Sequence, residues 1–394
     1  MNAFFLGSLA AWACVVAIAS RRSRSYMVFR AISLGIYVLL ASAMVHQAGL
    51  LTPVFYYLHS SVFIHSVALV APRMRPLWYR ALVSIPSAFM SAGTLLALPW
   101  AVAWALGFEP WAPWVPYLAA SIGLVQSFTT RIEEVDITVA DGEAVQGVQR
   151  HRRGRQRVAR PLHLVQITDP HLGPFMSETR LRRICERAVR RAPDLVLLTG
   201  DFLTMESQTD PAILARALAP LKQLEGRVFA CFGNHDHEAP DTVRRALASA
   251  GAKLLVDSAS VVDTAAGPVQ IVGFDFSYRD RALRMQACCT AHPRLPGTLR
   301  IALLHDPGAF QHLPEGEADL VVSGHTHGGQ VGLLSLGLPW TMLRLFAKIP
   351  DHGLWARGTD RLYVHRGTGH YGFPLRLGVP AEESLLRVHA APSG

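Results

Sequence analysis

Acidic residues and lysine are almost missing from the first third of this chain. Of the 394 residues, those numbered 1–130 include one acid, Glu109, seven arginines and no lysine. This region therefore supplies +6 of the formal net charge of +9, although it is otherwise apolar. A basic excess within an apolar region indicates membrane orientation signals rather than a nucleic-acid-binding surface, so we expect no nucleic-acid partner.

Cysteine is scarce as well. The chain has five cysteines, an odd number, and two of them, Cys288 and Cys289, are adjacent. Their spacing matches neither a disulfide framework nor a cysteine-based zinc site. This pattern favours a reducing compartment.

Five apolar stretches fill the first third of the chain. They cover residues 2–20, 31–49, 54–71, 81–107 and 113–129. A helix needs about 20 mostly apolar residues to cross the hydrocarbon core of a bilayer. The fifth stretch is the shortest, but Trp111, Trp114 and Tyr117 give it the aromatic flank that is typical of a membrane interface. We therefore predict an all-α membrane domain of about five spans over residues 1–130.

The arginines of this domain predict its orientation. All seven follow the first or the third apolar stretch, and the positive-inside rule places such loops in the cytoplasm. With five spans, the chain after Arg131 is then cytoplasmic, in a multi-pass protein of the inner (plasma) membrane. Two alternatives stay open. In the first, residues 1–20 form a cleaved signal peptide, although no basic residue precedes their apolar run. In the second, the fifth stretch does not span the membrane, and the rest of the chain faces the other side.

A basic segment at 149–160 separates the membrane domain from the first strand of the remaining chain. Basic residues next to a membrane attract anionic lipid headgroups, each contributing about 1 kcal/mol. A solvated loop is the alternative interpretation. No aromatic residues alternate with the arginines, as they do in many single-stranded nucleic-acid sites, so membrane lipids are the expected partner. The arginines are Arg150, Arg152, Arg153, Arg155, Arg157 and Arg160.

In residues 131–394, side chains of the metal-ligand type follow five short apolar runs, which are 162–168, 194–199, 227–232, 299–304 and 318–322. Runs of this length and composition are typical of buried strands. Helical patterns begin near Ser177, Asp210 and Asp241. Strands that alternate with helices predict a layered α/β domain, in which sites form beyond the carboxyl ends of strands. The residues found there are Asp169, His171, Asp201, Asn234, His235, His305, His325 and His327.

These side chains suit a pair of divalent metal ions. Carboxylate oxygens and neutral imidazole nitrogens are ligands for manganese, iron or zinc. Two such ions about 3.5–4 Å apart can hold a phosphoryl group and generate hydroxide near neutral pH. Asp201 stands alone at the end of its run, which suits a carboxylate that bridges the two ions.

The order Asp-x-His, Gly-Asp, Gly-Asn-His-Asp, His, Gly-His-x-His resembles the calcineurin-like metallophosphoesterase superfamily, over residues 131–394. The resemblance implies a β-sandwich flanked by helices, two divalent metal ions and hydrolysis of a phosphoester substrate. His235 would be the catalytic histidine, which contacts a phosphoryl oxygen or protonates the leaving group. One ion would be held by Asp169, His171, Asp201 and His327, and the other by Asp201, Asn234, His305 and His325.

Two positions depart from the Ser/Thr phosphatases of that superfamily. Those relatives carry a second acid three residues after the bridging aspartate, and an arginine follows it. This chain has Thr204 and Met205 at these positions, which argues against a protein phosphatase. Asp236 is a candidate to replace the missing acid.

Three further motifs resemble the membrane-associated branch of the superfamily: Gly328-Gly329-Gln330, Arg366-Gly367-Thr368-Gly369 and Pro374-Leu375-Arg376. That branch includes bacterial phosphodiesterases and enzymes that cleave the pyrophosphate of UDP-diacylglucosamine. The resemblance implies a phosphodiester or pyrophosphate bond in a lipid-linked substrate such as UDP-2,3-diacylglucosamine.

Residues 331–349, which we name the apolar loop, follow directly after the last ligand pair and are unusually apolar. Core packing beneath a long loop is one interpretation. The other is a loop that touches the bilayer and admits an acyl chain, with Arg344 and Lys348 at headgroup level. In that case the lipid-facing residues would be Trp340, Leu343 and Phe346.

The sequence thus favours a membrane-anchored, dinuclear-metal hydrolase of a phosphodiester or pyrophosphate bond. One alternative is a phosphodiesterase that acts on nucleotides. Another is a membrane scaffold or transporter with a degenerate hydrolase domain. A degenerate site normally lacks ligands, and this sequence retains every ligand of the pattern, which favours an enzyme.

Overall fold

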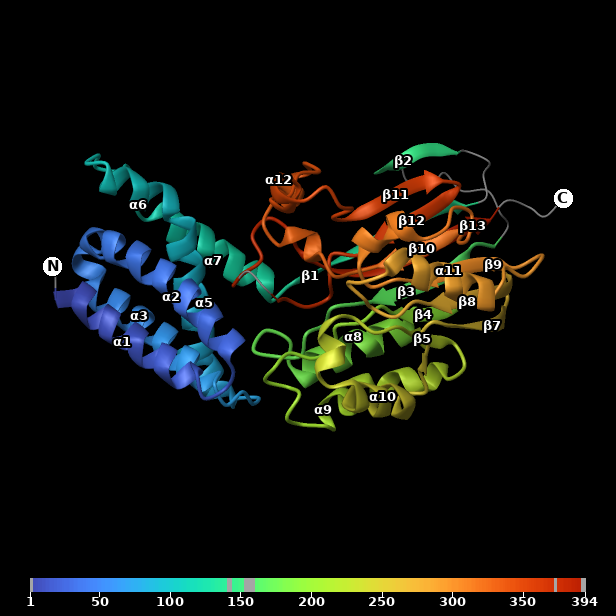
Figure 1. Ribbon diagram of the computed structural model, residues 1–394, viewed down its shortest axis with the longest axis horizontal. Helices are drawn as coiled ribbons and strands as arrows, with labels where there is room; N and C mark the ends of the chain where they lie inside the picture. Colours follow the sequence, from blue (N-terminus) through green and yellow to red (C-terminus); the bar gives the residue numbers. More distant parts are fainter. Residues whose placement is uncertain (1–2, 140–143, 152–159, 372–373, 391–394) are drawn as a thin grey trace. The chain divides into compact units, whose positions relative to one another are not determined.

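The computed structural model describes residues 3–139, 144–151, 160–371 and 374–390 (Figure 1). The chain forms two compact units. A helical unit comprises Met1–Phe128, Met205–Thr209 and Gly372–Leu377. An α/β unit comprises Thr129–Thr204, Asp210–Tyr371 and Gly378–Gly394.

The helical unit is built from apolar helices. Ser23 begins the longest of them, because its side chain accepts a hydrogen bond from the backbone N–H of Tyr26, as helix N-caps do. A core that includes Val38, Met44, Val62 and Met90 holds the helices together. The helices are α1 (Ala3–Ala19), α2 (Arg24–Met44), α3 (Thr52–Ala68), α4 (Leu77–Tyr79), α5 (Ile85–Leu96), α6 (Leu98–Ala105) and α7 (Val115–Ser127).

The prediction of about five membrane spans is not supported. Among the described residues, one helical run, Arg24–Gln47, is both long and apolar enough to cross a membrane. The pair Leu77–Leu96 and Leu98–Ala105, bent by 51°, adds a second only if it forms one span. The fourth apolar stretch breaks next to Pro99, since proline lacks an N–H and disfavours a helical residue before it. The fifth yields a helix of only 13 residues.

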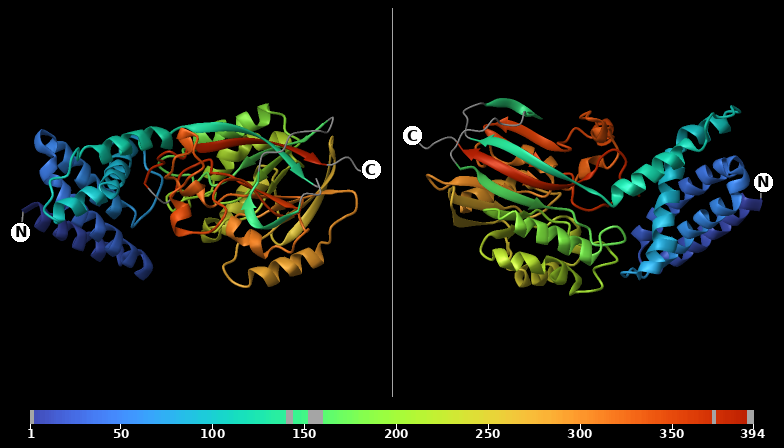
Figure 2. Two further views of the ribbon diagram at one scale, coloured as in Figure 1. Left: turned by 90° about the horizontal axis from the view of Figure 1, so that it is seen from above. Right: turned by 180° about the vertical axis from the view of Figure 1, so that it is seen from behind.

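Two β-sheets form the α/β unit (Figure 2). The first has the order β1-β13-β3-β4-β5-β6, and the second has the order β2-β11-β12-β10-β9-β8-β7. The strands of the first sheet are β1 (Thr130–Val139), β13 (Ala381–Ala390), β3 (Leu162–Ile167), β4 (Leu195–Leu198), β5 (Val228–Ala230) and β6 (Lys253–Leu254). Those of the second are β2 (Val145–Arg150), β11 (Gly353–Gly358), β12 (Asp360–Val364), β10 (Leu320–Ser323), β9 (Leu299–Leu303), β8 (Gly267–Gly273) and β7 (Ser258–Thr264).

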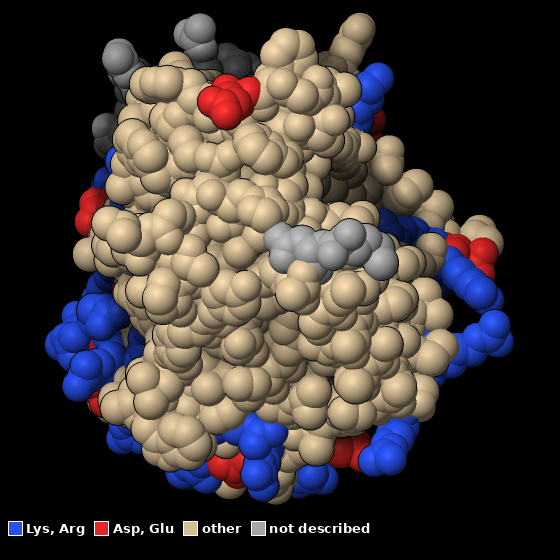
Figure 3. Space-filling view, turned by 90° about the vertical axis from the view of Figure 1, so that its left-hand side faces the viewer, with Lys and Arg blue, Asp and Glu red and all other residues tan. Residues whose placement is uncertain are grey.

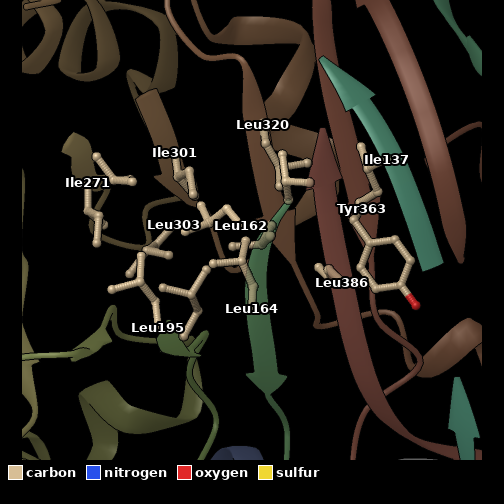
Figure 4. Packing of buried hydrophobic residues seen from close by; sticks show 14 of the residues in the cluster. Ile137, Leu162, Leu164, Leu195, Ile271, Ile301, Leu303, Leu320, Tyr363 and Leu386 are labelled. Atoms are coloured by element: carbon tan, nitrogen blue, oxygen red, sulfur yellow. The ribbon is translucent and has the colours of Figure 1, made fainter. Parts of the chain in front are cut away.

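The two sheets pack face to face around one apolar core. Leu164 and Leu195 of the first sheet lie in the same buried cluster as Ile271, Ile301 and Leu320 of the second (Figure 4). Strands that are buried on both faces need apolar residues at nearly every position, and for this reason they were recognisable in the sequence. The expected layered α/β domain, a sandwich of sheets with helices outside it, is therefore present.

Helices cover the outer faces of both sheets. The first sheet is flanked by α8 (Glu178–Arg190), α9 (Ile213–Leu218) and α10 (Pro240–Ser249), and α11 (Arg281–Ala291) packs on the second. Ser177 caps α8 as predicted, by accepting from the N–H of Arg180. The helix expected to begin near Asp210 instead starts at Ile213 and becomes a 3₁₀-helix at Ala219, next to Pro220.

Parallel pairing brings the predicted ligand segments to one region. β3, β4 and β5 are parallel neighbours, and so are β9 and β10, so that the segments after them leave the sheets on the same side. The Gln166 side chain, at the end of β3, donates to the carbonyl of Ser323, at the end of β10 (3.0 Å). This bond joins the carboxyl ends of the two sheets, which is where the ligand-type side chains gather.

Candidate metal centre and active site

Six of the predicted ligands form two clusters. Asp169, His171 and His327 make one, and Asp201, His305 and His325 make the other. Within each cluster, the ligand atoms of the three residues lie within 4.8 Å of one another. Segments that are more than 150 residues apart in sequence thus converge at the ends of four strands, β3, β4, β9 and β10.

Asp201 belongs to the second cluster and also approaches the first. Its Oδ2 is 3.6 Å from Nε2 of His171, in the first cluster, and 3.3 Å from Nε2 of His305, in the second. In the first cluster, Oδ1 of Asp169 lies 3.4 Å from Nε2 of His327. A carboxylate between two sets of imidazoles has the arrangement required of a bridging ligand.

Buried polar atoms without partners show that the residues fit metal ions. Both ring nitrogens of His171 and Oδ1 of Asn234 are buried and have no hydrogen-bond partner among the described residues. A buried polar atom left without a partner costs roughly 1–3 kcal/mol. Burial also lowers the pKa of His171 to about 3, which keeps its imidazole in the neutral form that binds metals. Metal ions would supply the missing partners of one ring nitrogen of His171 and of Oδ1 of Asn234.

The backbone at the ligands has an unusual conformation. Asp169, His171, Asp201, His325 and His327 all have positive φ angles, between 44° and 66°. Residues other than glycine rarely adopt this left-handed region, although Asp and His do so more often than most. The turn of the chain at each strand end directs these five side chains to a common centre. No simple sequence signal revealed this feature.

Two glycines make room for the carboxylates. A Cβ atom on Gly324 would lie 2.1 Å from Oδ2 of Asp169, and one on Gly233 would lie 2.2 Å from Oδ1 of Asp201. Real Cβ atoms never come so close to another heavy atom. The glycines of the Gly-His-x-His and Gly-Asn-His-Asp motifs are therefore required by close approach to ligands on neighbouring strands.

Hydrogen bonds to neighbouring groups hold the ligands in place. Nδ1 of His305 donates to the carbonyl of Thr199 (2.6 Å), which leaves Nε2 directed at Asp201. The Thr168 hydroxyl donates to Asp169 (2.7 Å), and the N–H of His325 donates to the same carboxylate. Such contacts fix the tautomer and orientation of metal ligands.

Asp236 braces the backbone of the ligand segments. Its buried carboxylate accepts three hydrogen bonds, from the N–H groups of Asp201 (2.8 Å), Phe202 (2.9 Å) and Gly233 (2.7 Å). Burial and the nearby charge of Asp201 raise its pKa to about 7. The suggestion that Asp236 replaces the missing second acid beside His235 is thus not supported, because its oxygens are directed to these amides.

His235 contacts two residues that the sequence did not reveal. Its Nδ1 lies 2.8 Å from a carboxylate oxygen of Glu238, and its ring makes an edge contact with Tyr371, at 4.6 Å between ring centres. Burial lowers the pKa of His235, but Glu238 and Asp201 raise it by more, so the pKa lies above its ordinary value. The three-residue spacing of His235 and Glu238 was a usable signal, whereas nothing in the sequence pointed to Tyr371.

The apolar loop begins two residues after Gly329 and is largely exposed. Phe346 is 80% exposed and Trp340 36%, whereas Val331 and Thr341 of the same loop are buried. Contact of these aromatic residues with lipid stays a prediction. Leu343 differs, since it is half-buried and packs closely against Gly329. A Cβ atom added to Gly329 would lie 2.8 Å from the Cβ of Leu343. The loop includes the short helix α12 (Leu343–Phe346).

The basic segment is described only at its ends. Arg150 donates to Asp351 (2.8 Å) and lies over the ring of Trp355, and Arg160 pairs with Asp194 (3.2 Å). The four arginines between them, at 152, 153, 155 and 157, lie outside the described residues, so the expected contact with lipid headgroups stays a prediction.

A sandwich of two sheets, with two clusters of carboxylate and imidazole ligands at the ends of its strands, defines a metal-dependent hydrolase of phosphoesters. Comparison with known proteins agrees. Residues 162–329 match the sequence profile of the calcineurin-like phosphoesterase family. The chain therefore carries a calcineurin-like metallophosphoesterase domain, which together with its metallophosphoesterase relatives makes it a metal-dependent phosphoesterase.

Several curated relatives carry the same domain. Phosphodiesterase YaeI of Escherichia coli is 29% identical over 240 residues, which cover 58% of this chain and 83% of YaeI. Metallophosphoesterase YkoQ of Bacillus subtilis is 29% identical over 236 residues, with 58% and 83% coverage. A bovine transmembrane protein with a metallophosphoesterase domain is 29% identical over 259 residues, which cover 59% of this chain but only 54% of the bovine protein.

Proposed function

We propose that this phosphoesterase cleaves a phosphodiester or pyrophosphate bond in a lipid-linked substrate at a membrane surface. The observation that carries the proposal is the exposed apolar loop, which continues from the segment that holds His325 and His327. An exposed apolar segment normally marks a site of contact with another molecule or with a membrane. A substrate that is anchored in the bilayer would reach the metal centre along this loop.

The residues of the site have separate roles in this proposal. Asp169, His171, Asp201 and His327 would hold one divalent ion, and Asp201, Asn234, His305 and His325 the other. Bound there, manganese, iron or zinc would polarise the phosphoryl group and lower the pKa of a water molecule. His235 would give a proton to the leaving oxygen. The buried Thr168 and Asp236 would exclude bulk water behind the ligands, and the partly buried Tyr371 would flank His235.

A hollow beside the second cluster would receive the part of the substrate next to the phosphoryl group. It opens to solvent and includes His305 among its lining residues, with Phe276, Arg281 and Asp306. Arg281 is held there by an ion pair to Asp306 (2.7 Å). The position of His305 means that a molecule in this hollow would lie next to the metal centre.

The helical unit would anchor the enzyme in the membrane. Many large apolar side chains of its helices are exposed, among them Phe29, Ile32 and Leu39 on α2. Figure 3 shows a broad face of this unit with almost no charged side chains. Arg22, after α1, donates to the carbonyl of Leu69, after α3 (2.7 Å), so the two arginine-bearing loops lie at one end of the unit. The positive-inside rule then makes this end cytoplasmic.

The proposal can be tested with the full chain reconstituted in lipid nanodiscs. Hydrolysis would be measured for UDP-diacylglucosamine, other phospholipids, cyclic nucleotides and a soluble bis-aryl phosphate, each with and without manganese. We expect metal-dependent hydrolysis of the aryl ester and faster turnover of at least one lipid-linked substrate. Preference for cyclic nucleotides, or no hydrolysis of any lipid, would refute the lipid-linked proposal.

A further inference from the structure

The catalytic histidine requires a group that orients its ring. In the Ser/Thr phosphatases this group is the second acid, and this chain has Thr204 in its place. The Thr204 hydroxyl is buried and donates to the carbonyl of Leu172 (2.6 Å). The nearby carboxylate of Asp236 accepts from three backbone amides. Neither residue directs a side-chain acceptor at His235.

Glu238 supplies such an acceptor. It lies on the same four-residue 3₁₀ turn, His235–Glu238, and its Oε1 is 2.8 Å from Nδ1 of His235. In a 3₁₀ turn, residues three apart lie on the same side, which explains the contact. A carboxylate can only accept, so Nδ1 carries the hydrogen, and Nε2 is the nitrogen that remains for the substrate.

The turn itself is fixed to the ligand segments. The N–H of His235 donates to Oδ1 of Asp201 (2.8 Å), and the N–H of Gly233, just before the turn, donates to Asp236 (2.7 Å). The position of His235 is thus tied to the carboxylate that lies between the two clusters. Glu238 then only has to set the rotation of the imidazole ring.

Tyr371 limits the same ring from a second direction. Its ring stacks on His171 (4.5 Å between ring centres, 13° between planes) and meets His235 at a steep angle (4.6 Å, 67°). The Gln330 side chain donates to the carbonyl of Tyr371. The N–H groups of Thr368 and Gly369 donate to the carbonyls of Thr168 (2.8 Å) and Asp169 (3.0 Å). The Gly-Gly-Gln and Arg-Gly-Thr-Gly motifs thus hold the tyrosine beside the histidine.

We propose that Glu238 is the positioning residue for His235 and that Tyr371 fixes the plane of the imidazole. The inference rests on the proposed role of His235 as proton donor. As the oxygen of a hydroxide ion bonds to phosphorus, the bond between phosphorus and the leaving oxygen breaks. Its electron pair stays on the leaving oxygen, which takes the proton from Nε2. The imidazole becomes neutral and keeps its Nδ1–H bond to Glu238, so that the ring holds its orientation throughout the transfer.

The test compares leaving groups, because a proton donor accelerates hydrolysis most when the leaving group is a poor one. Full-length Glu238→Ala and Glu238→Gln variants would be assayed on phosphodiesters whose leaving alcohols range from a nitrophenol to an alkyl alcohol. General acid catalysis typically contributes about 10²–10⁴-fold. We expect Glu238→Ala to lower kcat for the alkyl ester by roughly 10–100-fold, with little change in KM, and by less than about threefold for the nitrophenyl ester. Glu238→Gln keeps an acceptor but loses the charge, and its kcat for the alkyl ester should lie between those of Glu238→Ala and the wild type.

Three controls separate positioning from a structural effect. Glu186→Gln changes a surface glutamate that pairs with Arg182 on α8 and should change neither rate. Metal content should remain that of the wild type in every Glu238 variant. In a His235→Ala background, Glu238→Ala should have no further effect, since it acts only through the histidine.

The role of Tyr371 is tested with two substitutions, Tyr371→Phe and Tyr371→Ala. Tyr371→Phe keeps the ring and should preserve the dependence on leaving group, whereas Tyr371→Ala should weaken turnover of the alkyl ester. An equal loss for both esters, or additive effects of the Glu238 and His235 substitutions, would overturn the inference. Failure of the wild-type protein to hydrolyse any of the esters with manganese would instead refute the proposed function.

Discussion

Removal of exposed aromatic side chains from the apolar loop should impair the use of lipid substrates selectively. Trp340 and Phe346 are 36% and 80% exposed. Since an aromatic side chain offers about 150–250 Å², the two present roughly 250 Å² to their surroundings. At about 25 cal/mol per Å² this corresponds to roughly 6 kcal/mol if a bilayer covers all of it. Insertion to half that extent would contribute about 3 kcal/mol, or about 100-fold in an equilibrium constant.

The assay compares one soluble and one lipid substrate in the same nanodisc preparation. The double variant Trp340→Ala/Phe346→Ala should raise KM for the lipid substrate by about 10–100-fold and leave hydrolysis of bis-aryl phosphate within about twofold of the wild type. Leu283→Ala provides a matched control, because Leu283 is 73% exposed but lies on α11, outside the loop. It should alter neither activity.

Leu343 provides an internal contrast. Because it packs against Gly329, next to the ligand segment, Leu343→Ala should lower activity on both substrates. The reasoning would be refuted if the Trp340/Phe346 variant lost both activities equally, which would indicate a packing role. It would also be refuted if the variant retained full activity on the lipid, which would exclude contact with the membrane.

Other changes test the metal centre and the fold. Asp201→Asn should remove most of the bound metal and lower kcat by at least about 10³-fold, because a metal ion contributes several kcal/mol of charge stabilisation; an active, metal-free variant would contradict the mechanism. Gly324→Ala, whose Cβ would lie 2.1 Å from Asp169, should lower metal content in elemental analysis and cost about 1–3 kcal/mol in denaturant unfolding. Burial alone raises the pKa of Glu382, but His365 and Arg366 lower it to about 2. A carboxyl group whose pKa is lower in the folded state stabilises the fold at every pH above its unfolded pKa. Unfolding midpoints should therefore fall as the pH drops from 4.5 towards 2, and Glu382→Gln should flatten this dependence.

The parts of the fold that were predictable share one property, burial on both faces. The strands β3, β4, β9 and β10 appear in the sequence as short, continuous apolar runs. β1 was missed, since it lies at a sheet edge and most of its residues are exposed or only partly buried. Its partner β13 is more than 240 residues away, and a parallel pairing at that distance leaves no local pattern.

The membrane spans show a different limit. The apolar stretches were recognisable from composition, but an apolar stretch is not the same as a continuous helix. Pro99 coincides with the bend between α5 and α6, and Pro116 lies at the start of the 13-residue α7. Composition sets which residues can face lipid, whereas helix length depends on where the backbone can keep its hydrogen bonds.

In the site, sequence order identified the ligand types but not the direction of neighbouring side chains. His235 and Asp236 are adjacent, yet one faces the centre and the other binds amides behind it. Glu238 meets His235 because of a tight turn, and Tyr371 meets it from 136 positions further along the chain. Only the folded backbone determines contacts of these two kinds.

The conformation of the ligands explains why so many hydrogen bonds surround them. Five of the predicted ligands have left-handed φ angles, and such strained residues cost on the order of 1–3 kcal/mol each, so they persist only where the surrounding structure holds them. Here Asp236 binds the amides at Asp201, and Gly324 and Gly233 give the carboxylates space. The close-packed glycines and the buried aspartate are therefore part of the metal centre in an energetic sense, although none of them is a predicted ligand. Substitution there should disturb metal binding as much as loss of a ligand does.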